Sequence, residues 1–534
     1  MLQMRARPQK KLSIRKHHET ENDMNSPLSW LTRSLAAVVK KTCLYSCMLA
    51  VPAALMVTSG CTLAPDYERP DVEIPTEFRY EPRVVSETAN TTWWTQFGDP
   101  VLDELIATAL VNNYDVKIAA ANVEQALGIV TQTRSDLYPQ IGYGASGEKR
   151  RLGRGDTELS GALPDNLKIP NKLETYQAFL SASWELDLWG RIRSLSDAAQ
   201  ANMLATEEVR RGVILTLVST VATSYINLRG LDEQLAVSRA TLATYAESVR
   251  LYKLQFKYGQ TSLMTVAQSE SQYETAATQI PQIESQIVQQ ENALSVLLGD
   301  NPGAIPRGKS ISELVSPTVP AGLPSLLLER RPDLLQAEQG LIGANAQIGA
   351  AKALYFPTIS LTGAFGDSSS NLSDLFKGSS RTWNYAGQIV GPIFSFGAVS
   401  GQVAQSEAAQ RAALASYELA VQSAFADVDN ALVAYLKTGE QLEAQQRLVS
   451  ALTEYERLAK LQYDAGYVPY STVLQAQQNL FPAELALAAL RAALLEASAN
   501  IYKAMGGGWI DEADKLSGRA PTVTAEPPTV PPLF

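Results

Sequence analysis

Hydrophobic and polar positions along the chain follow two periods, and each period marks one kind of element. Several short segments alternate with period two, which is typical of strands with one apolar and one polar face. In the clearest segment one face carries Tyr176, Ala178, Leu180, Ala182, Trp184, Leu186 and Leu188. Phe179 is the one apolar residue on the opposite face. Shorter segments of the same kind begin at Ile141, Ile359 and Trp383.

Much longer segments have helical spacing. Residues 194–258 contain no proline, and at 1.5 Å per residue about 65 residues form a rod of roughly 100 Å. A second helix is predicted over 262–298, with a kink or break at Pro281. The same pair returns at 399–464 and 470–505, where Pro482 is the matching interruption.

The stretch at the turn between these helices occurs twice. LYKLQFKYGQTSLMTVAQ at residues 251–268 returns as LAKLQYDAGYVPYSTVLQ at 458–475, a shift of 207 positions. A glycine, Gly259 or Gly466, ends the first helix of each copy, because glycine tolerates the positive φ of that position. Ser/Thr caps are predicted to begin the second helix, at Thr261-Ser262 and at Ser471-Thr472. The chain is therefore an internal duplication.

Each half is predicted to contain a helix, two strands and a long helical hairpin. The helix before the strands covers about 115–137 in the first copy and 333–357 in the second, here at a shift of 218. The extra residues of the first copy fall in 147–172, a polar, glycine-rich loop. Asp99 is predicted to cap the first helix, with Pro100 at its first position.

The strands by themselves leave two architectures open. Segments of about 9–11 residues with one apolar face and terminal aromatic residues suit a membrane barrel. A soluble sandwich with one wet face is the alternative, and the helices alone are also compatible with a soluble coiled coil. Four strands cannot close around a lumen, so a barrel would have to be completed by an oligomer.

The N-terminal region has the pattern of an export signal. Lys40 and Lys41 precede an apolar run at 42–56, and small residues follow up to Gly60-Cys61. A permanent membrane helix is disfavoured because the run is shorter than the ~20 residues that a span requires. The segment resembles a bacterial lipoprotein signal, with Cys61 as lipid acceptor. Since Thr62 rather than Asp follows, the resemblance implies sorting to the outer membrane.

The predicted organisation has six parts. These are a removed signal at 1–60, a lipidated extended arm at 61–95, a first repeat at 96–299, a linker at 300–325, a second repeat at 326–509 and a disordered tail at 510–534. The arm, the linker and the end of the tail are rich in proline and carry no sustained period.

Residue usage excludes several classes of function. Both histidines, His17 and His18, and two of the three cysteines, Cys43 and Cys47, lie in the predicted signal. The mature chain would lack histidine-based catalysis, thiol nucleophiles, disulfides and the usual zinc ligands, and no paired-acid motif is found. We expect no enzyme, no catalytic or metal site, and no cofactor beyond the covalent lipid on Cys61.

Charge and methionine usage argue against two further kinds of binding partner. Nine basic and three acidic residues lie in positions 1–60, which leaves 36 basic and 52 acidic residues in the body. An acidic body argues against a nucleic-acid partner. Only Met203, Met264 and Met505 lie outside the signal region, so soft-metal binding is not supported.

Several stretches together closely resemble the outer-membrane factors of Gram-negative tripartite efflux systems, in the lipoprotein branch often called the NodT family, relatives of TolC. The matching pieces are Cys61–Tyr67, Trp93-Trp94 with Phe97 and Asp99-Pro100, Asp187–Arg191, Leu323–Glu338, Ala344–Pro357 and Lys503–Trp509. The resemblance implies an α+β membrane protein that forms a homotrimer. Each chain would give four strands to a 12-stranded transmembrane β-barrel in the outer membrane, above a long periplasmic α-helical barrel of coiled hairpins.

The resemblance also implies sites and partners. The periplasmic aperture falls at Ser471, Thr472 and Gln475, a neutral polar ring. Tyr463 and Asp464 are expected to link helices or to act as structural caps. A periplasmic adaptor, joined to an inner-membrane resistance-nodulation-division pump, would dock on the hairpin tips, and the outer-membrane lipid would hold the anchor. The tip residues are Gly259, Gln260, Gly466 and Tyr467.

Three functions remain open from the sequence. The first is a passive duct for drugs or small molecules, with metal export as a subdivision. The second is the duct of a type I protein secretion system, which uses the same scaffold. The third is a lipoprotein that scaffolds the envelope and transports nothing. The lipoprotein signal and the Gly506–Trp509 ending resemble the first group better.

Overall fold

The computed structural model of the chain describes residues 62–75, Phe78, Tyr80, 92–151, 172–319 and 324–516. The predicted signal, Cys61 and the end of the predicted tail lie outside these residues. None of the helices in the described ranges combines the length and apolar character that a membrane crossing requires.

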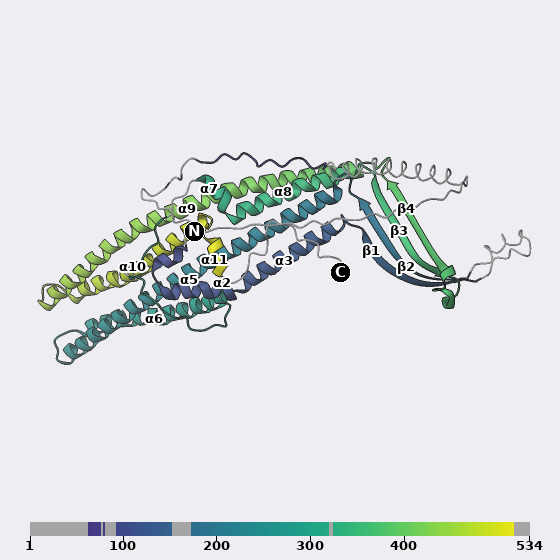
Figure 1. Ribbon diagram of the computed structural model, residues 1–534. Coiled ribbons are helices and arrows are strands. Elements are labelled where there is room, and N and C mark those ends of the chain that lie inside the picture. Colours follow the sequence, from purple (N-terminus) through teal and green to yellow (C-terminus); the bar gives the residue numbers. More distant parts are fainter. Residues whose placement is uncertain are drawn as a thin grey trace, which may run out of the picture. The chain divides into compact units, whose positions relative to one another are not determined.

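The element order repeats once along the chain (Figure 1). The first half contains η1 (Trp93–Phe97), α2 (Pro100–Asn112), α3 (Tyr114–Ser135), β1 (Gln140–Arg151), β2 (Lys172–Leu186), α5 (Arg191–Lys257) and α6 (Leu263–Leu298). The second half contains α7 (Pro324–Arg330), α8 (Pro332–Ala353), β3 (Thr358–Ser369), η4 (Leu372–Asp374), η5 (Gly378–Ser380), β4 (Arg381–Val390), α9 (Ala398–Asp464), α10 (Tyr470–Ala504) and α11 (Ile510–Leu516). The predicted order of helix, two strands and helical hairpin is confirmed in both halves.

Glycines with positive φ mark the same points of both copies. Gly190 and Gly397 precede α5 and α9, with φ of 72° and 91°. The two other pairs, Gly259 with Gly466 and Gly299 with Gly506, follow the hairpin helices. Each pair is separated by 207 positions. Because a side chain is strained at these angles, the duplication has kept glycine where the backbone reverses or changes element.

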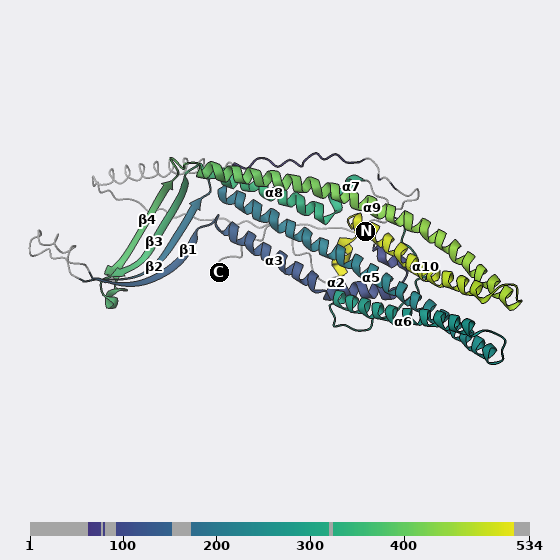
Figure 2. The same cartoon turned by 180° about the vertical axis from the view of Figure 1, so that it is seen from behind.

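The long helix α5 is the centre of the helical part. It packs against α6 in its own hairpin, and against α3, α8 and α10, while α9 packs against α8 and α10. Figures 1 and 2 show the two hairpins extending away from the sheet, with α3 and α8 on the sheet side. Where α5 approaches α10, a Cβ atom on Gly230 would lie only 2.7 Å from Ala492 Cβ, so glycine permits this close contact.

The prediction that Pro281 and Pro482 break their helices is wrong. Both prolines lie inside continuous helices, α6 and α10. Both are exposed, so water can reach the carbonyl that each proline leaves without an intrahelical donor. The buried neighbours Ala276 and Phe481 pack against Tyr245 of α5, and this contact supports the helices on both sides of the seam.

The four strands form one antiparallel sheet in the order β1-β2-β3-β4. Two indoles fix its base to the helices: Trp184 Nε1 donates to Leu137 O at 2.9 Å, and Trp189 Nε1 donates to Pro357 O at 2.8 Å. The predicted loop at 147–172 is wrong in its first part, because Gly147–Arg151 belongs to β1 and pairs with Lys172–Tyr176. Backbone ladders do not require apolar side chains, so the strand continues past the alternating pattern.

The main core is closed by aromatic residues from both ends of the chain. Trp93 stacks on Tyr502 with ring centroids 5.2 Å apart, and Trp94 meets Trp509 edge to face at 5.3 Å. This packing corrects two predicted boundaries. The last residues of the extended arm are in the buried 3-10 helix η1, and the tail begins with a helix, α11, whose Ile510 is buried.

The linker between the halves is held by one buried carboxylate. Asp99, fully buried, caps α2 by accepting from Val101 N at 3.0 Å, as predicted. Its other oxygen accepts from Tyr225 Oη at 2.8 Å and from Lys309 N at 3.0 Å. One side chain thus joins α2, α5 and the linker.

Candidate functional site

One face of the sheet is apolar across all four strands. The register places Tyr143 opposite Leu180, Leu180 opposite Phe365, and Phe365 opposite Trp383, so these residues form one row. Tyr143 is 90% exposed and Tyr385, on the same face, is 80% exposed. A large exposed apolar surface on a strand face is typical of contact with lipid or with another protein.

The opposite face is polar and nearly free of large apolar side chains. It carries Gly142, Gly144, Ser146, Gln177, Ser181, Ser183, Ser360, Thr362, Thr382, Asn384 and Gln388. Phe179 is the exception that the sequence pattern shows. A Cβ atom on Gly144 would lie 2.8 Å from Phe179 Cζ, so the ring lies over a residue of the neighbouring strand that has no side chain.

The sheet has two open edges within the described chain. Strand β1 pairs only with β2, and β4 pairs only with β3. Unpaired edges of this length are templates for pairing with another chain.

The hairpin tips are exposed turns of one type. Gln260 N donates to Gln255 O at 2.8 Å, and Tyr467 N donates to Gln462 O at 2.9 Å, the bonds of a Schellman turn around Gly259 and Gly466. All four predicted tip residues are exposed, and Tyr467 is 84% exposed. Large apolar side chains around them are also exposed: Leu254, Tyr258, Leu263, Met264 and Leu461.

The predicted helix caps hold in one copy only. Ser262 caps α6, and its Oγ accepts from Thr265 N at 3.2 Å. In the second copy the cap prediction is wrong, because α10 begins at Tyr470 after Pro469 and has no side-chain cap. Ser471 and Thr472 therefore lie inside the first turn of α10. Pro469 fixes the backbone before the helix, and its carbonyl oxygen accepts from Thr472 N at 3.0 Å.

A cluster of three tyrosines joins the two hairpins just above their tips. Tyr252 of α5 lies edge to face with Tyr470 of α10 at 4.6 Å and with Tyr463 of α9 at 6.1 Å, and Tyr463 and Tyr470 are 5.5 Å apart. Burial, and then the neighbouring Tyr463, raises the pKa of the Tyr470 hydroxyl to about 12. We call these residues the tyrosine cluster.

The predicted aperture residues lie next to this cluster. Ser471 and Gln475 are exposed and four positions apart, so they share one face of α10, while Thr472 is half-buried. Tyr463 contacts the rings of Tyr252 and Tyr470, which lie on two other helices. Asp464 is the exposed last residue of α9 and forms no ion pair with the residues that the structure describes.

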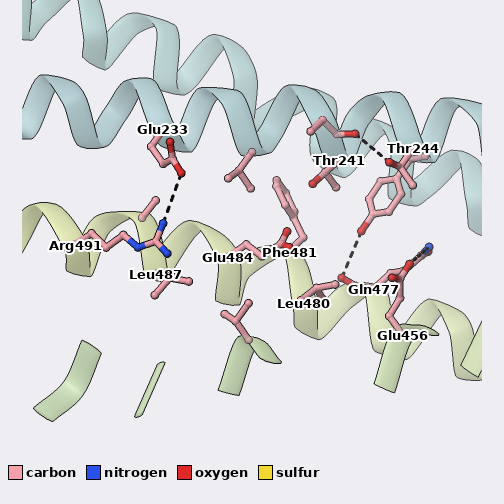
Figure 3. A pocket seen from close by; sticks show the side chains of 15 residues that line it. Glu233, Thr241, Thr244, Glu456, Gln477, Leu480, Phe481, Glu484, Leu487 and Arg491 are labelled. Atoms are coloured by element: carbon pink, nitrogen blue, oxygen red, sulfur yellow. Dashed lines mark hydrogen bonds and ion pairs between the residues drawn. The ribbon is translucent and has the colours of Figure 1, made fainter. Parts of the chain in front are cut away.

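Further from the tips, the seam between α5, α9 and α10 contains a cavity of ≈ 390 Å³ (Figure 3). We call it the seam cavity. Arg491 Nη1 of α10 lies 3.7 Å from Glu233 Oε1 of α5. Gln477 Nε2 of α10 donates to Glu456 Oε1 of α9 at 3.3 Å. The first contact joins the two hairpins across the cavity, and the second joins α9 and α10 within the second hairpin.

Glu484 of α10 also lines the seam cavity. Burial, with the Glu456 carboxylate as the second cause, raises the pKa of the Glu484 carboxyl. Two carboxylates on adjacent helices make the seam sensitive to protonation.

The N-terminal arm is fixed along α8. Tyr67 Oη donates to Glu338 at 3.1 Å, Arg69 forms an ion pair with the same carboxylate at 2.7 Å, and Asn345 Nδ2 donates to Pro65 O at 2.7 Å. The arm therefore leads back toward Cys61, which lies outside the described residues.

A family model described as outer membrane efflux protein matches residues 105–300 and 323–507, which is more than half of the chain. The chain belongs to this family. Among its curated relatives, the cation efflux system protein CusC of Escherichia coli O6:H1 is 35% identical, over 87% of this chain and 99% of its own length. The probable efflux pump outer membrane protein TtgC of Pseudomonas putida is also 35% identical, over 89% and 99%.

Solved structures agree with this membership. The crystal structure of the open state of the MtrE outer membrane channel of Neisseria gonorrhoeae is 33% identical, with a TM-score of 0.75 over 84% of this chain and 99% of that one. This efflux family member is thus an outer-membrane channel rather than an enzyme, and the predicted family, fold class and outer-membrane location are confirmed.

Within this efflux channel, sequence reasoning missed the partners of Tyr463 and the whole seam cavity. The sequence contained one indication of the tyrosine cluster. Tyr252 falls on Ala459 at the shift of 207, so the cluster uses a position where the two copies differ. The glutamates of the seam cavity have no such signal, because their neighbours lie on three separate helices.

Proposed function

We propose that three copies of the chain assemble into the outer-membrane duct of a tripartite efflux pump. Their sheets would pair β4 of one copy with β1 of the next and close a 12-stranded barrel. The hairpins would continue below it as a water-filled tube in the periplasm. The row of Tyr143, Leu180, Phe365 and Trp383 on one face, with the polar face behind it, is the observation that carries the proposal.

The polarity of the two faces of the sheet determines which face contacts lipid. An exposed apolar face is stable only against hydrocarbon, and a polar face requires water, so the apolar row faces outward and the polar face lines the lumen. Closing the barrel also pairs both open strand edges, which would otherwise remain unsatisfied in a membrane.

The partners follow from the exposed tips. A periplasmic adaptor, itself joined to an inner-membrane resistance-nodulation-division pump, would bind the turns at Gly259-Gln260 and Gly466-Tyr467. The exposed Tyr258, Leu263 and Met264 next to the first turn supply apolar contact area. A lipid on Cys61 would anchor the arm in the inner leaflet of the outer membrane, and the removed signal would end at Gly60.

The closed end of the duct would be formed by α10. Ser471, Thr472 and Gln475 from three copies would meet as a neutral polar ring, and the tyrosine cluster would hold α10 against α5 in this state. Opening then requires the second hairpin to move relative to the first. That movement separates Tyr252 from Tyr463 and Tyr470.

The exported substances are proposed to be small organic molecules. The relatives carry names for cation, toluene and antibiotic efflux, so both metals and organic solutes belong in the test. The test is the susceptibility of a deletion strain to antibiotics, organic solvents, detergents, copper and silver salts. Sensitisation to the organic compounds, reversed by the wild-type gene, is expected. Loss of a secreted protein with unchanged susceptibility would contradict the proposal and favour a type I secretion duct.

A further inference from the structure

We propose that the polar face of the sheet carries a binding subsite for uncharged aromatic solutes, with Phe179 as its wall. This deepens the proposed function and rests on it, because the polar face is the lumen wall only in the assembled duct. The subsite is a hollow of ≈ 300 Å³ between Phe179 of β2 and Asn384 of β4. These strands are separated by β3 in the sheet (Figure 1).

The hollow exists because of three residues with little or no side chain. The end of the Phe179 ring lies over Gly144 of β1, on the side away from β4. The floor between Phe179 and Asn384 is made by Ala364 and Gly366 of β3. At Gly366 a Cβ atom would lie 2.1 Å from Ala178 O, so no side chain can fill the floor. The side of the ring that faces β4 therefore borders open space.

The chemistry of the rim selects the solute class. Gln177, Ser368, Thr382 and Asn384 line the hollow, and within the described residues none of these side chains is held in a protein hydrogen bond. Phe365, Asp367 and Trp383 also line the hollow, but the strand alternation assigns their side chains to the opposite face. On that face Arg381 lies 5.7 Å from the Phe365 ring centroid. A ring beside neutral amides and hydroxyls suits an aromatic solute that carries an amide or hydroxyl group.

A weak subsite of this kind is compatible with transport. A duct must release its solute, so binding has to be strong enough for entry and weak enough for exit. One aromatic wall and one or two hydrogen bonds give millimolar binding rather than the tight binding of an enclosed pocket.

The test measures binding without transport. Benzamide and cyclohexanecarboxamide have the same amide and nearly the same size, and only the first has an aromatic ring. Each is titrated against the purified full-length protein by ligand-observed NMR, with empty micelles as the blank. Wild type is expected to bind benzamide with a millimolar Kd and cyclohexanecarboxamide several-fold more weakly.

Substitutions then locate the site. Phe179→Leu keeps apolar cover over Gly144 but removes the ring, and should raise the benzamide Kd about three- to tenfold. Phe179→Tyr keeps the ring and should stay within about twofold of wild type. Asn384→Ala should weaken benzamide about threefold through the lost amide partner. Tyr385→Leu is the matched control, an aromatic residue of β4 that lies on the opposite face and does not line the hollow, and should change nothing.

Equal Kd values for benzamide in wild type and Phe179→Leu would overturn the subsite, as would equal binding of the two carboxamides. If Phe179→Leu does not fold, the comparison of Asn384→Ala with the control Tyr385→Leu decides the question: equal benzamide Kd values for these two variants would overturn the subsite. Failure here leaves the duct intact, because conductance across a planar bilayer reports the duct separately. Absence of conductance with normal benzamide binding would instead contradict the proposed function.

Discussion

Tyr252 and Tyr470 belong to different repeats, 218 positions apart, and their rings meet edge to face at 4.6 Å. Tyr470 also contacts Tyr463 at 5.5 Å, so one ring holds the first turn of α10 to both long helices. Aromatic pairs of this geometry contribute about 0.5–1.5 kcal/mol each beyond their buried area.

Tyr470→Ala is expected to open the periplasmic end. Losing two ring contacts destabilises the closed state relative to the open state by about 1–3 kcal/mol. This lowers the ratio of closed to open channels roughly five- to 150-fold. The measurement is the open fraction of single channels in planar bilayers. Tyr455→Ala, at a partly exposed position of α9, is the control and should leave the open fraction unchanged. An unaltered open fraction in Tyr470→Ala would remove the cluster from the gate.

The seam cavity predicts a dependence on pH. The raised pKa of Glu484 means that the folded seam favours the protonated carboxyl. Protonated Glu484 therefore stabilises the folded seam fully at pH values below the ordinary glutamate pKa, and this stabilisation is lost as the pH rises through the raised pKa of Glu484. The seam is therefore expected to be tighter at pH 5 than at pH 7.5, measured as slower hydrogen exchange of α10 amides after correction for the intrinsic rate.

Glu484→Gln should abolish most of this difference and keep the seam tight at pH 7.5. The exposed Glu418→Gln on α9 should behave as wild type. The same pH difference in Glu484→Gln as in wild type would assign the effect to other groups.

Asp99→Ala is expected to destabilise the region where the halves of the chain are joined. The substitution removes the cap of α2 and leaves the buried Tyr225 hydroxyl without its acceptor, at a combined cost of about 2–4 kcal/mol. Thermal unfolding of the purified protein measures the loss. Glu104→Ala, an exposed position on the same helix, should shift the Tm by no more than a degree or two. Equal Tm values for Asp99→Ala and wild type would show that the carboxylate is dispensable.

Cys61→Ala tests the lipid anchor. The mature wild-type protein should carry an acyl modification at its N-terminus by mass spectrometry, and the variant should lack it and keep its signal. Cys47→Ala, within the predicted signal, is the control and should be processed normally. Folding should survive in Cys61→Ala, because the contacts of Tyr67 and Arg69 with Glu338 hold the arm without the lipid. Acylated Cys61→Ala protein would show that the acceptor is elsewhere.

Local patterns predicted the elements well because each depends on nearby residues. Gly259 and Gly466 end their helices with φ of 76° and 78°, as the repeat around them indicates. The alternation in 176–188 identified both faces of β2, including Phe179 as the exception. The errors also have local causes. Pro281 and Pro482 lie on exposed positions that tolerate proline inside a helix, and Pro469, the residue before α10, provides no side-chain cap.

The sequence by itself determined the duplication, the long hairpins, the two-faced strands and the family, because periodicity and backbone angles are encoded within a few residues. Only the tertiary structure decided which residues meet across the repeats. Tyr252 reaches Tyr470, Phe179 lies over Gly144, and Trp94 meets Trp509 because helix packing and strand register bring them together. No spacing along the chain encodes such contacts, since each depends on the relative placement of elements tens to hundreds of residues apart.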